Sequence, residues 1–220
     1  MMVTFSDVRD NAAIRTYISK ADEAMTVLGY TEHGFAHAGK VAEDCRYILE
    51  TMGYPRREVE LAQIAGFIHD IGNLVNRIEH SQSGAVMAFR LLDHLKCDAE
   101  GIAIITSAIG NHDEGTGVAV NPVAAALILA DKCDVRRSRV RNKESINHDI
   151  HDRVNYSVKK SSLRINEDKT LIKLKLNIDT KYGSVMDYFE IFLGRMIMCR
   201  KAAETLNLQF KLIINEQQLI

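Results

Sequence analysis

The histidine and aspartate residues of this sequence fall in positions where they could bind metal ions. The chain has eight histidines, and His69 directly precedes Asp70 where an apolar stretch ends. His80 and His112 each stand beside an expected helix end. Taken singly, each histidine also fits a helix cap or a surface position. Asp131 follows an uninterrupted apolar run, so we expect it to be buried, and a buried carboxylate needs a cation or hydrogen-bond donors.

One shared metal site would explain these residues together. Imidazole nitrogens combined with carboxylate oxygens suit iron, manganese, zinc or cobalt better than Ca²⁺ or Mg²⁺, which prefer oxygen ligands alone. Four histidines and two aspartates exceed what a single metal with an open position uses, which favours two metals bridged by a carboxylate. Asp70 is the expected bridge, because His69 places it beside one ion. His33 and His37 are four residues apart and would share a face if that stretch is helical.

Hydrophobic residues recur at helical spacing from about residue 6 to about residue 153. We therefore expect helices to position the candidate metal ligands. A first clear helix covers residues 41–53 and ends at Gly53, and the next follows Pro55 and ends at Gly72. Asn121 and Pro122 predict the cap and first turn of a later helix. That helix and the two before it are expected over residues 83–95, 101–110 and 121–141.

The hydrophobic period changes after about residue 154. Apolar and polar residues alternate strictly from Ile172 to Asp179, which predicts a half-buried strand over residues 171–179. Residues 161–166 are predicted to be its hairpin partner. A long amphipathic helix over residues 184–207 and a final strand over residues 208–214 follow. The predicted fold is therefore mainly α, with a helical domain over residues 1–153 that carries the metal site. Residues 154–220 would form a small β-β-α-β subdomain, packed on it or on a partner subunit.

Composition limits the classes of partner and location. Hydrophobic residues make up 46% of the chain, which supports a real core, and the net charge of −1 creates no global field for nucleic acid or acidic membranes. The four cysteines form no CxxC pair, which fits reduced thiols rather than a zinc knuckle or a disulfide framework. No signal-peptide pattern is present, and the longest apolar run, residues 123–130, is too short to span a membrane. We expect a cytoplasmic protein.

Five short motifs occur in an order that resembles the HD superfamily of metal-dependent phosphohydrolases. They are H-x-x-x-V-A (37–42), H-D-I-G (69–72), H-x-x-x-G (80–84), A-I-x-x-H (108–112) and L-A-D-K (129–132). The His-Asp dipeptide alone is a weak signal, but five motifs in order and at helix-compatible spacing are a strong one. The resemblance covers about residues 25–140 and implies an HD-domain helical bundle. Among subfamilies, the motifs are most similar to HD-type dinucleoside polyphosphate hydrolases and more distantly to HD-GYP phosphodiesterases, although no GYP motif follows His112.

Carried over position by position, the resemblance implies a ligand set. The family's primary metal residues fall on His37, His69, Asp70 and Asp131, and the additional pair of two-metal subfamilies falls on His80 and His112. Asp70 and His69 are then the predicted catalytic residues. The implied cofactors are two divalent transition-metal ions, with Fe or Mn favoured and Zn, Ni or Co left open. Two such ions would neutralise phosphoryl oxygens and activate a water to hydroxide for in-line attack.

Cations near this set could hold the phosphates of a substrate. Lys132 follows Asp131 directly, and Arg136 and Arg139 come soon after; a solvated basic helix end explains them equally well. His33 lies where some family members carry another metal-binding residue, so a third metal or a substrate contact stays open there. Many superfamily hydrolases read HDIGK, whereas Asn73 stands at the lysine position here and cannot carry charge. These five residues are the candidate substrate contacts.

The predicted function is hydrolysis of a phosphoester or phosphoanhydride in a small phosphorylated molecule, with a nucleotide favoured. The alternative is a mixed-valence di-iron oxygenase of the HD fold, as in myo-inositol oxygenase, because the ligand order is the same. A third option, a module that only binds a nucleotide, is disfavoured because the ligand set has no gap. We expect no membrane partner and no nucleic acid, and a homodimer stays open.

Overall fold

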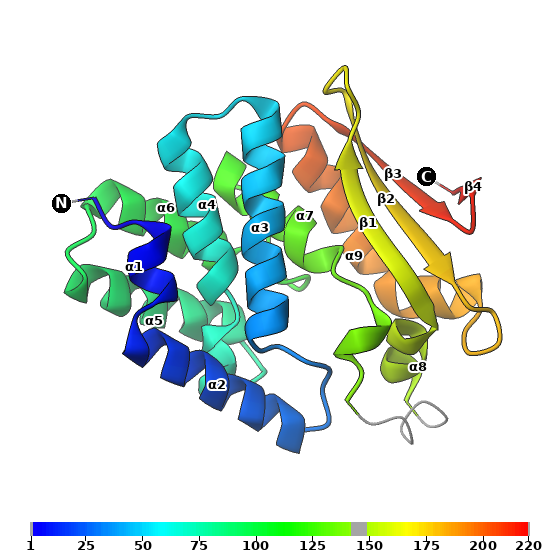
Figure 1. The fold of residues 1–220 in the computed structure, drawn as a ribbon, viewed down its shortest axis with the longest axis horizontal. Coiled ribbons are helices and arrows are strands. Elements are labelled where there is room, and N and C mark those ends of the chain that lie inside the picture. The colour runs from blue at the N-terminus through cyan, green and yellow to red at the C-terminus, as the bar shows by residue number, and fades with distance from the viewer. Residues whose placement is uncertain (1, 142–148, 220) are drawn as a thin grey trace.

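The computed structural model describes residues 2–141 and 149–219. Its helical part precedes a small sheet in the chain, and the two lie side by side (Figure 1). The helices of the first part are α1 (Phe5–Arg9), α2 (Ala12–Val27), α3 (Phe35–Met52), α4 (Arg56–Ile68), α5 (His80–His94), α6 (Ala99–Gly110) and α7 (Pro122–Lys132), with two 3₁₀ turns, η1 (Ile71–Leu74) and η2 (Arg137–Arg139). The mainly α prediction is confirmed.

The second part follows the predicted order of a hairpin, a long helix and a strand. Its elements are α8 (Ile150–Ser157), β1 (Val158–Ile165), β2 (Leu171–Ile178), α9 (Val185–Thr205), β3 (Gln209–Ile214) and β4 (Gln217–Gln218). The sheet order is β1-β2-β3-β4, and β2 and β3 are parallel because α9 crosses between them, whereas the other pairs are antiparallel. The alternation predicted for β2 is confirmed, since its buried residues are Ile172, Leu174, Leu176 and Ile178.

The central helix of the fold is α7. Every residue from Val123 to Ala130 is buried, as expected for a helix that is hydrophobic on all sides. It packs against α3, α4 and α6 and, on another side, against α9, which also contacts β3. Buried side chains of both parts of the chain therefore form one continuous hydrophobic cluster. The division into domains at residue 153 stays a prediction.

Three local predictions need correction. The helix expected to reach residue 141 ends at Lys132, because Cys133 caps it and the chain turns into η2, where the guanidinium of Arg139 binds the carbonyl of Asp134. The α4 helix ends at Ile68 rather than at Gly72, which lies in the following 3₁₀ turn. His33 precedes α3, whose N-cap is Gly34, so His33 and His37 do not share a helix.

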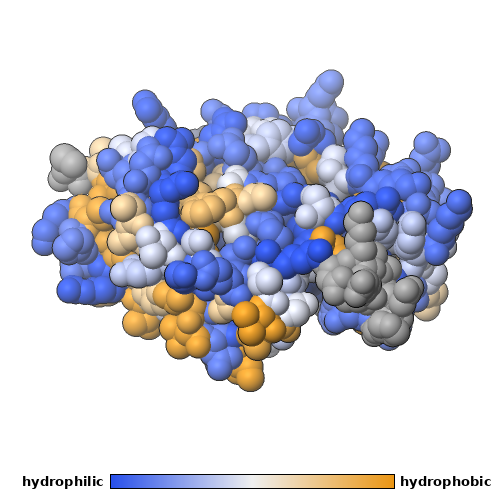
Figure 2. Space-filling view, turned by 60° about the horizontal axis from the view of Figure 1, so that its bottom comes forward, coloured by the Kyte–Doolittle hydropathy of each residue, from blue (hydrophilic) through white to orange (hydrophobic). Residues whose placement is uncertain are grey.

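The surface of the helical part carries exposed hydrophobic residues. Figure 2 shows hydrophobic side chains gathered over this part, while the part that bears the strands is mostly hydrophilic on the same face. Val75, Ile78 and Val86 are between 67% and 77% exposed. Within the described residues, no helix is both long and apolar enough to cross a membrane. The homodimer that the sequence left open stays untested.

Gly72 brings the 3₁₀ turn against the start of α5. A Cβ atom at this position would press on the carbonyl oxygen of His80 and lie 2.5 Å from the backbone nitrogen of Gly84. We predict that Gly72→Ala lowers the free energy of unfolding by about 1–3 kcal/mol through this overpacking and weakens metal retention, because His80 shifts. Denaturant titration and bound-metal analysis would measure both effects.

The control for this substitution is Gly194→Ala. Gly194 lies within α9, and a Cβ there would meet nothing within 4 Å. Its free energy of unfolding should stay the same or rise by up to about 1 kcal/mol, because Ala favours the helix. Equal stability of the two variants would contradict the close approach at Gly72.

Candidate metal centre

Helix ends bring six histidines and aspartates to one place. His37 lies in the first turn of α3, His69 caps the C-terminal end of α4, and Asp70 precedes η1. His80 is the first residue of α5, His112 follows Asn111, the C-cap of α6, and Asp131 lies in the last turn of α7. The six are the residues predicted as metal ligands: His37, His69, Asp70, His80, His112 and Asp131.

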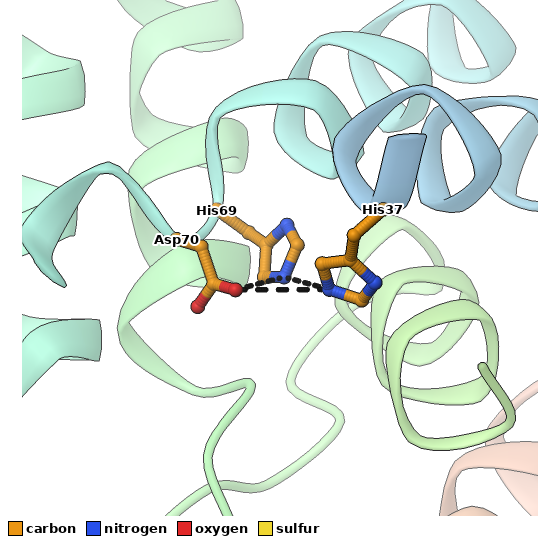
Figure 3. A group of neighbouring side chains, drawn as sticks. All are labelled: His37, His69 and Asp70. Carbon is orange, nitrogen blue, oxygen red and sulfur yellow. Dashed lines mark hydrogen bonds and ion pairs between the residues drawn. The ribbon is translucent and has the colours of Figure 1, made fainter. Parts of the chain in front are cut away.

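A first group of donor atoms surrounds the imidazoles of His37 and His69. Their Nε2 atoms are 3.3 Å apart, and Oδ2 of Asp70 lies 3.6 Å from the first and 3.3 Å from the second (Figure 3). On another side, Oδ1 of Asp131 lies 3.3 Å from Nε2 of His37 and 3.6 Å from Nε2 of His69. The two nitrogens therefore lie between an oxygen of Asp70 and an oxygen of Asp131.

A second group lies on the other oxygen of Asp70. Its Oδ1 atom is 3.4 Å from Nε2 of His80 and 3.9 Å from Nε2 of His112. In each of three triads of these residues, the donor atoms lie within 4.8 Å of one another. Asp70 thus faces one group with each oxygen, which is the arrangement that a carboxylate bridging two ions requires.

The four imidazoles are oriented by hydrogen bonds at their other nitrogen. Nδ1 of His69 lies 2.9 Å from the carbonyl oxygen of Gly66, and Nδ1 of His80 and of His112 lie 3.1 and 2.6 Å from the backbone carbonyls three residues before them. Nδ1 of His37 lies 2.8 Å from Oδ2 of Asp134. Such acceptors fix the proton on Nδ1, so that the Nε2 lone pair is available to a metal.

The pKa values of the histidines in this group show that its carboxylates favour a positive charge beside them. Burial opposes ionisation of His69, but Asp70 and Asp131 outweigh it and raise the pKa of His69 to about 10. Burial and the charge of Lys132 lower the pKa of His112 to about 3. In the absence of metal, a proton on His69 compensates the two carboxylates, while His112 is already a neutral ligand. Nitrogen and carboxylate donors around buried negative charge fit borderline transition metals.

A cavity of about 430 Å³ opens above these residues. Asp70, His80 and Asp131 line it, and so do the predicted substrate contacts Lys132 and Arg139. Further lining residues, Tyr30 and Arg77 among them, come from the segment before α3 and from the turn before α5.

Two of the predicted substrate contacts that line the cavity, Lys132 and Arg139, already bind groups of the protein. Nζ of Lys132 lies 2.9 Å from Oδ2 of Asp131 and 3.6 Å from both Asp113 and Glu114, so its charge is already neutralised. Arg139 is buried, and it donates from Nε and Nη1 to the carbonyls of Glu32 and Asp134, at 2.9 Å each. It joins the segment before α3 to the segment after α7.

His33 lines the cavity too, and its Nδ1 lies 2.6 Å from the carbonyl oxygen of Thr31. Burial and the charge of Arg139 lower the pKa of His33, so its imidazole is neutral.

Arg136 and Asn73 are not among the lining residues. Arg136 donates from Nε to Oδ1 of Asp134 at 2.7 Å, so it supports the carboxylate that orients His37. Asn73 is buried, donates to the backbone carbonyl of Asp70 at 3.0 Å and accepts from Nη1 of Arg77 at 3.3 Å. Both side chains contact the residues that surround the metal ligands rather than the cavity.

Sequence reasoning missed three residues of the site. Arg77 places Nη1 4.0 Å from Oδ1 of Asp70 and 3.4 Å from Nε2 of His80, four residues after Asn73. Arg77 lies between η1 and α5, outside any helix, so no helical spacing pointed to it. For Asp134, the available signal was its place three residues after Asp131, in the D-K-C-D run. Arg195 lines the cavity from α9, and no local pattern connects it to the motifs.

Comparison with known proteins identifies the region that holds the centre. Residues 34–136 match the HD domain family. This region is an HD domain. It contains all six residues of the cluster, while α8, α9 and the sheet lie outside it.

Two further proteins are similar to the chain. The uncharacterized protein MJ1020 of Methanocaldococcus jannaschii is 23% identical over 192 residues, which cover 76% of this chain and 73% of that protein. The crystal structure of a predicted HD superfamily hydrolase from an uncultured Thermotogales bacterium matches with a TM-score of 0.44 and 23% identity, over 56% of this chain and 67% of that chain.

Metal binding to the HD domain should release a proton. Since the pKa of His69 is raised to about 10, its imidazole is charged at neutral pH, and a metal can bind it only after the proton leaves. We predict release of about one proton per chain and an affinity that rises with pH through the neutral range. Calorimetry of Mn²⁺ binding in buffers of different ionisation enthalpy measures this number. Metal uptake without proton release would show that His69 is not a ligand.

Proposed function

We propose that the protein is a metal-dependent phosphohydrolase that cleaves a phosphoester or phosphoanhydride of a small phosphorylated molecule, with a nucleotide favoured. The observation that carries this proposal is the position of Asp70. Its two oxygens face two groups of imidazoles at the floor of the cavity, as a site for two divalent metals requires. Fe or Mn is the favoured metal.

Cationic side chains in the wall of the cavity, which also holds Asp149 and Asp152, support an anionic substrate. Arg77, Arg139 and Arg195 line the cavity together with the neutralised Lys132, and these cations belong to separate parts of the chain. Arginine is suited to phosphate because its planar guanidinium can donate two parallel hydrogen bonds. An uncharged substrate would leave these buried and half-buried guanidinium groups without a function in the cavity.

The protein's own residues would act on the substrate by positioning and by charge. Bound divalent metals would neutralise the phosphoryl oxygens and supply an activated water as the nucleophile. Asp70 and Asp131, with His37, His69, His80 and His112, would hold those metals. Arg77, next to Asp70 and His80, would donate to a phosphoryl oxygen bound at the floor. Asp134 would keep His37 in the tautomer whose Nε2 faces the centre.

The test is turnover by reconstituted protein in strictly anaerobic buffer. Protein purified without added metal is loaded with Mn²⁺ or Fe²⁺ and assayed for phosphate release from nucleotides and simple phosphoesters. We predict hydrolysis without oxygen, and loss on the order of 10³-fold or more in kcat/KM together with loss of bound metal in Asp70→Ala.

The matched control is Asp93→Ala, since Asp93 is an exposed acid on α5, the helix that begins at His80. It should keep both metal and activity. Hydrolysis that survives Asp70→Ala would refute the site. Substrate conversion that requires dioxygen would favour the di-iron oxygenase instead. The cytoplasmic location stays a prediction.

A further inference from the structure

One wall of the cavity comes from outside the HD domain. Phe192 and Arg195 of α9 both line the cavity, three residues apart and therefore on one face of the helix. Phe192 is 1% exposed and belongs to the core, and the guanidinium carbon of Arg195 lies 4.6 Å from the centre of its ring. The guanidinium of Arg195 thus packs on a buried aromatic ring of the core.

A single ion pair orients Arg195 within this wall. Its Nε contacts Oε1 of Glu114, which lies in the segment that follows His112. Burial raises the pKa of Glu114, but the charges of Lys132 and Arg195 lower it to about 2, so the carboxylate is ionised. Among the described residues, Glu114 is the ion-pair partner of Arg195, and neither terminal nitrogen, Nη1 or Nη2, donates a hydrogen bond.

Two further contacts connect Arg195 to the metal centre. Oε2 of Glu114 lies 3.6 Å from Nζ of Lys132, which in turn lies 2.9 Å from Oδ2 of Asp131. Arg195 is therefore beside the centre but not at it. Because three carboxylates already surround Lys132, the terminal nitrogens of Arg195 are better placed to act as cationic donors on this side.

We propose that Arg195 binds a second anionic group of the substrate, next to the phosphoryl group that is cleaved. The guanidinium presents two parallel donors that fit the oxygens of a phosphate. The C-terminal segment then selects substrates with at least two linked anionic groups over simple monoesters. This inference rests on the proposed function, because it assigns the cleaved phosphoryl group to the metal centre.

The test compares two inorganic anions on the metal-loaded, full-length protein. Inorganic triphosphate and orthophosphate are titrated calorimetrically in Mn²⁺-saturated buffer, so that the anions do not strip the centre. In Arg195→Gln, the Kd for triphosphate should rise by about 10- to 100-fold, since a charge-assisted contact is lost, while the Kd for orthophosphate stays unchanged. Arg195→Lys, which keeps the charge without the planar fork, should recover part of the affinity.

The matched control is Arg200→Gln, an exposed position on the same helix, which should leave both affinities unchanged. Bound metal and melting temperature are measured for every variant. A triphosphate Kd that does not change in Arg195→Gln, or equal weakening of both anions, would overturn the inference. Triphosphate binding that depends on Arg195 in a protein without hydrolytic activity would support the inference and refute the proposed reaction.

Discussion

A buried carboxylate in contact with four imidazoles is the constraint on which the centre depends. Asp70 is 9% exposed, and its oxygens face His37 and His69 on one side and His80 and His112 on the other. Removal of such a charge from water is costly unless cations compensate it. In the metal-free protein a proton on one imidazole provides part of this compensation, and two divalent ions would provide far more. We expect the affinity for metal to arise from the same buried charge.

Residues close to Asp70 in the sequence place the groups that surround its carboxylate. Gly72 lets the 3₁₀ turn approach the start of α5, which brings His80 to the second oxygen. Asn73 is uncharged, and its amide binds the Asp70 carbonyl and Arg77. The positive charge expected at Asn73 is therefore supplied four residues later, by Arg77, which lies 4.0 Å from the carboxylate.

The sequence predicted the parts of the structure that depend on local patterns. Alternation over residues 171–179 gave β2, and Asn121 with Pro122 gave the start of α7. The six expected ligands could be named because each sits in a short motif at a helix end. The cations were harder to place, since Lys132 is neutralised by Asp113 and Glu114 and Arg136 by Asp134, and these pairings depend on tertiary contacts.

The part of the cavity formed by α9 could not be predicted from local sequence patterns either. Arg195 lies more than sixty residues beyond Asp131 in the sequence and reaches the cavity only because α9 packs against α7. No spacing rule connects residues so far apart. The end of α7 at Lys132 could not be predicted either, because the turn that follows is held by Arg139, which donates to the carbonyls of Asp134 and of the distant Glu32.

Anomalous X-ray diffraction from crystals of Mn²⁺-loaded protein, recorded on both sides of the manganese absorption edge, tests the dinuclear centre most directly. Two peaks are predicted, with Asp70 between them. One should be in contact with His37, His69 and Asp131, and the other with His80 and His112. A single peak, or peaks that do not contact Asp70, would contradict the dinuclear centre.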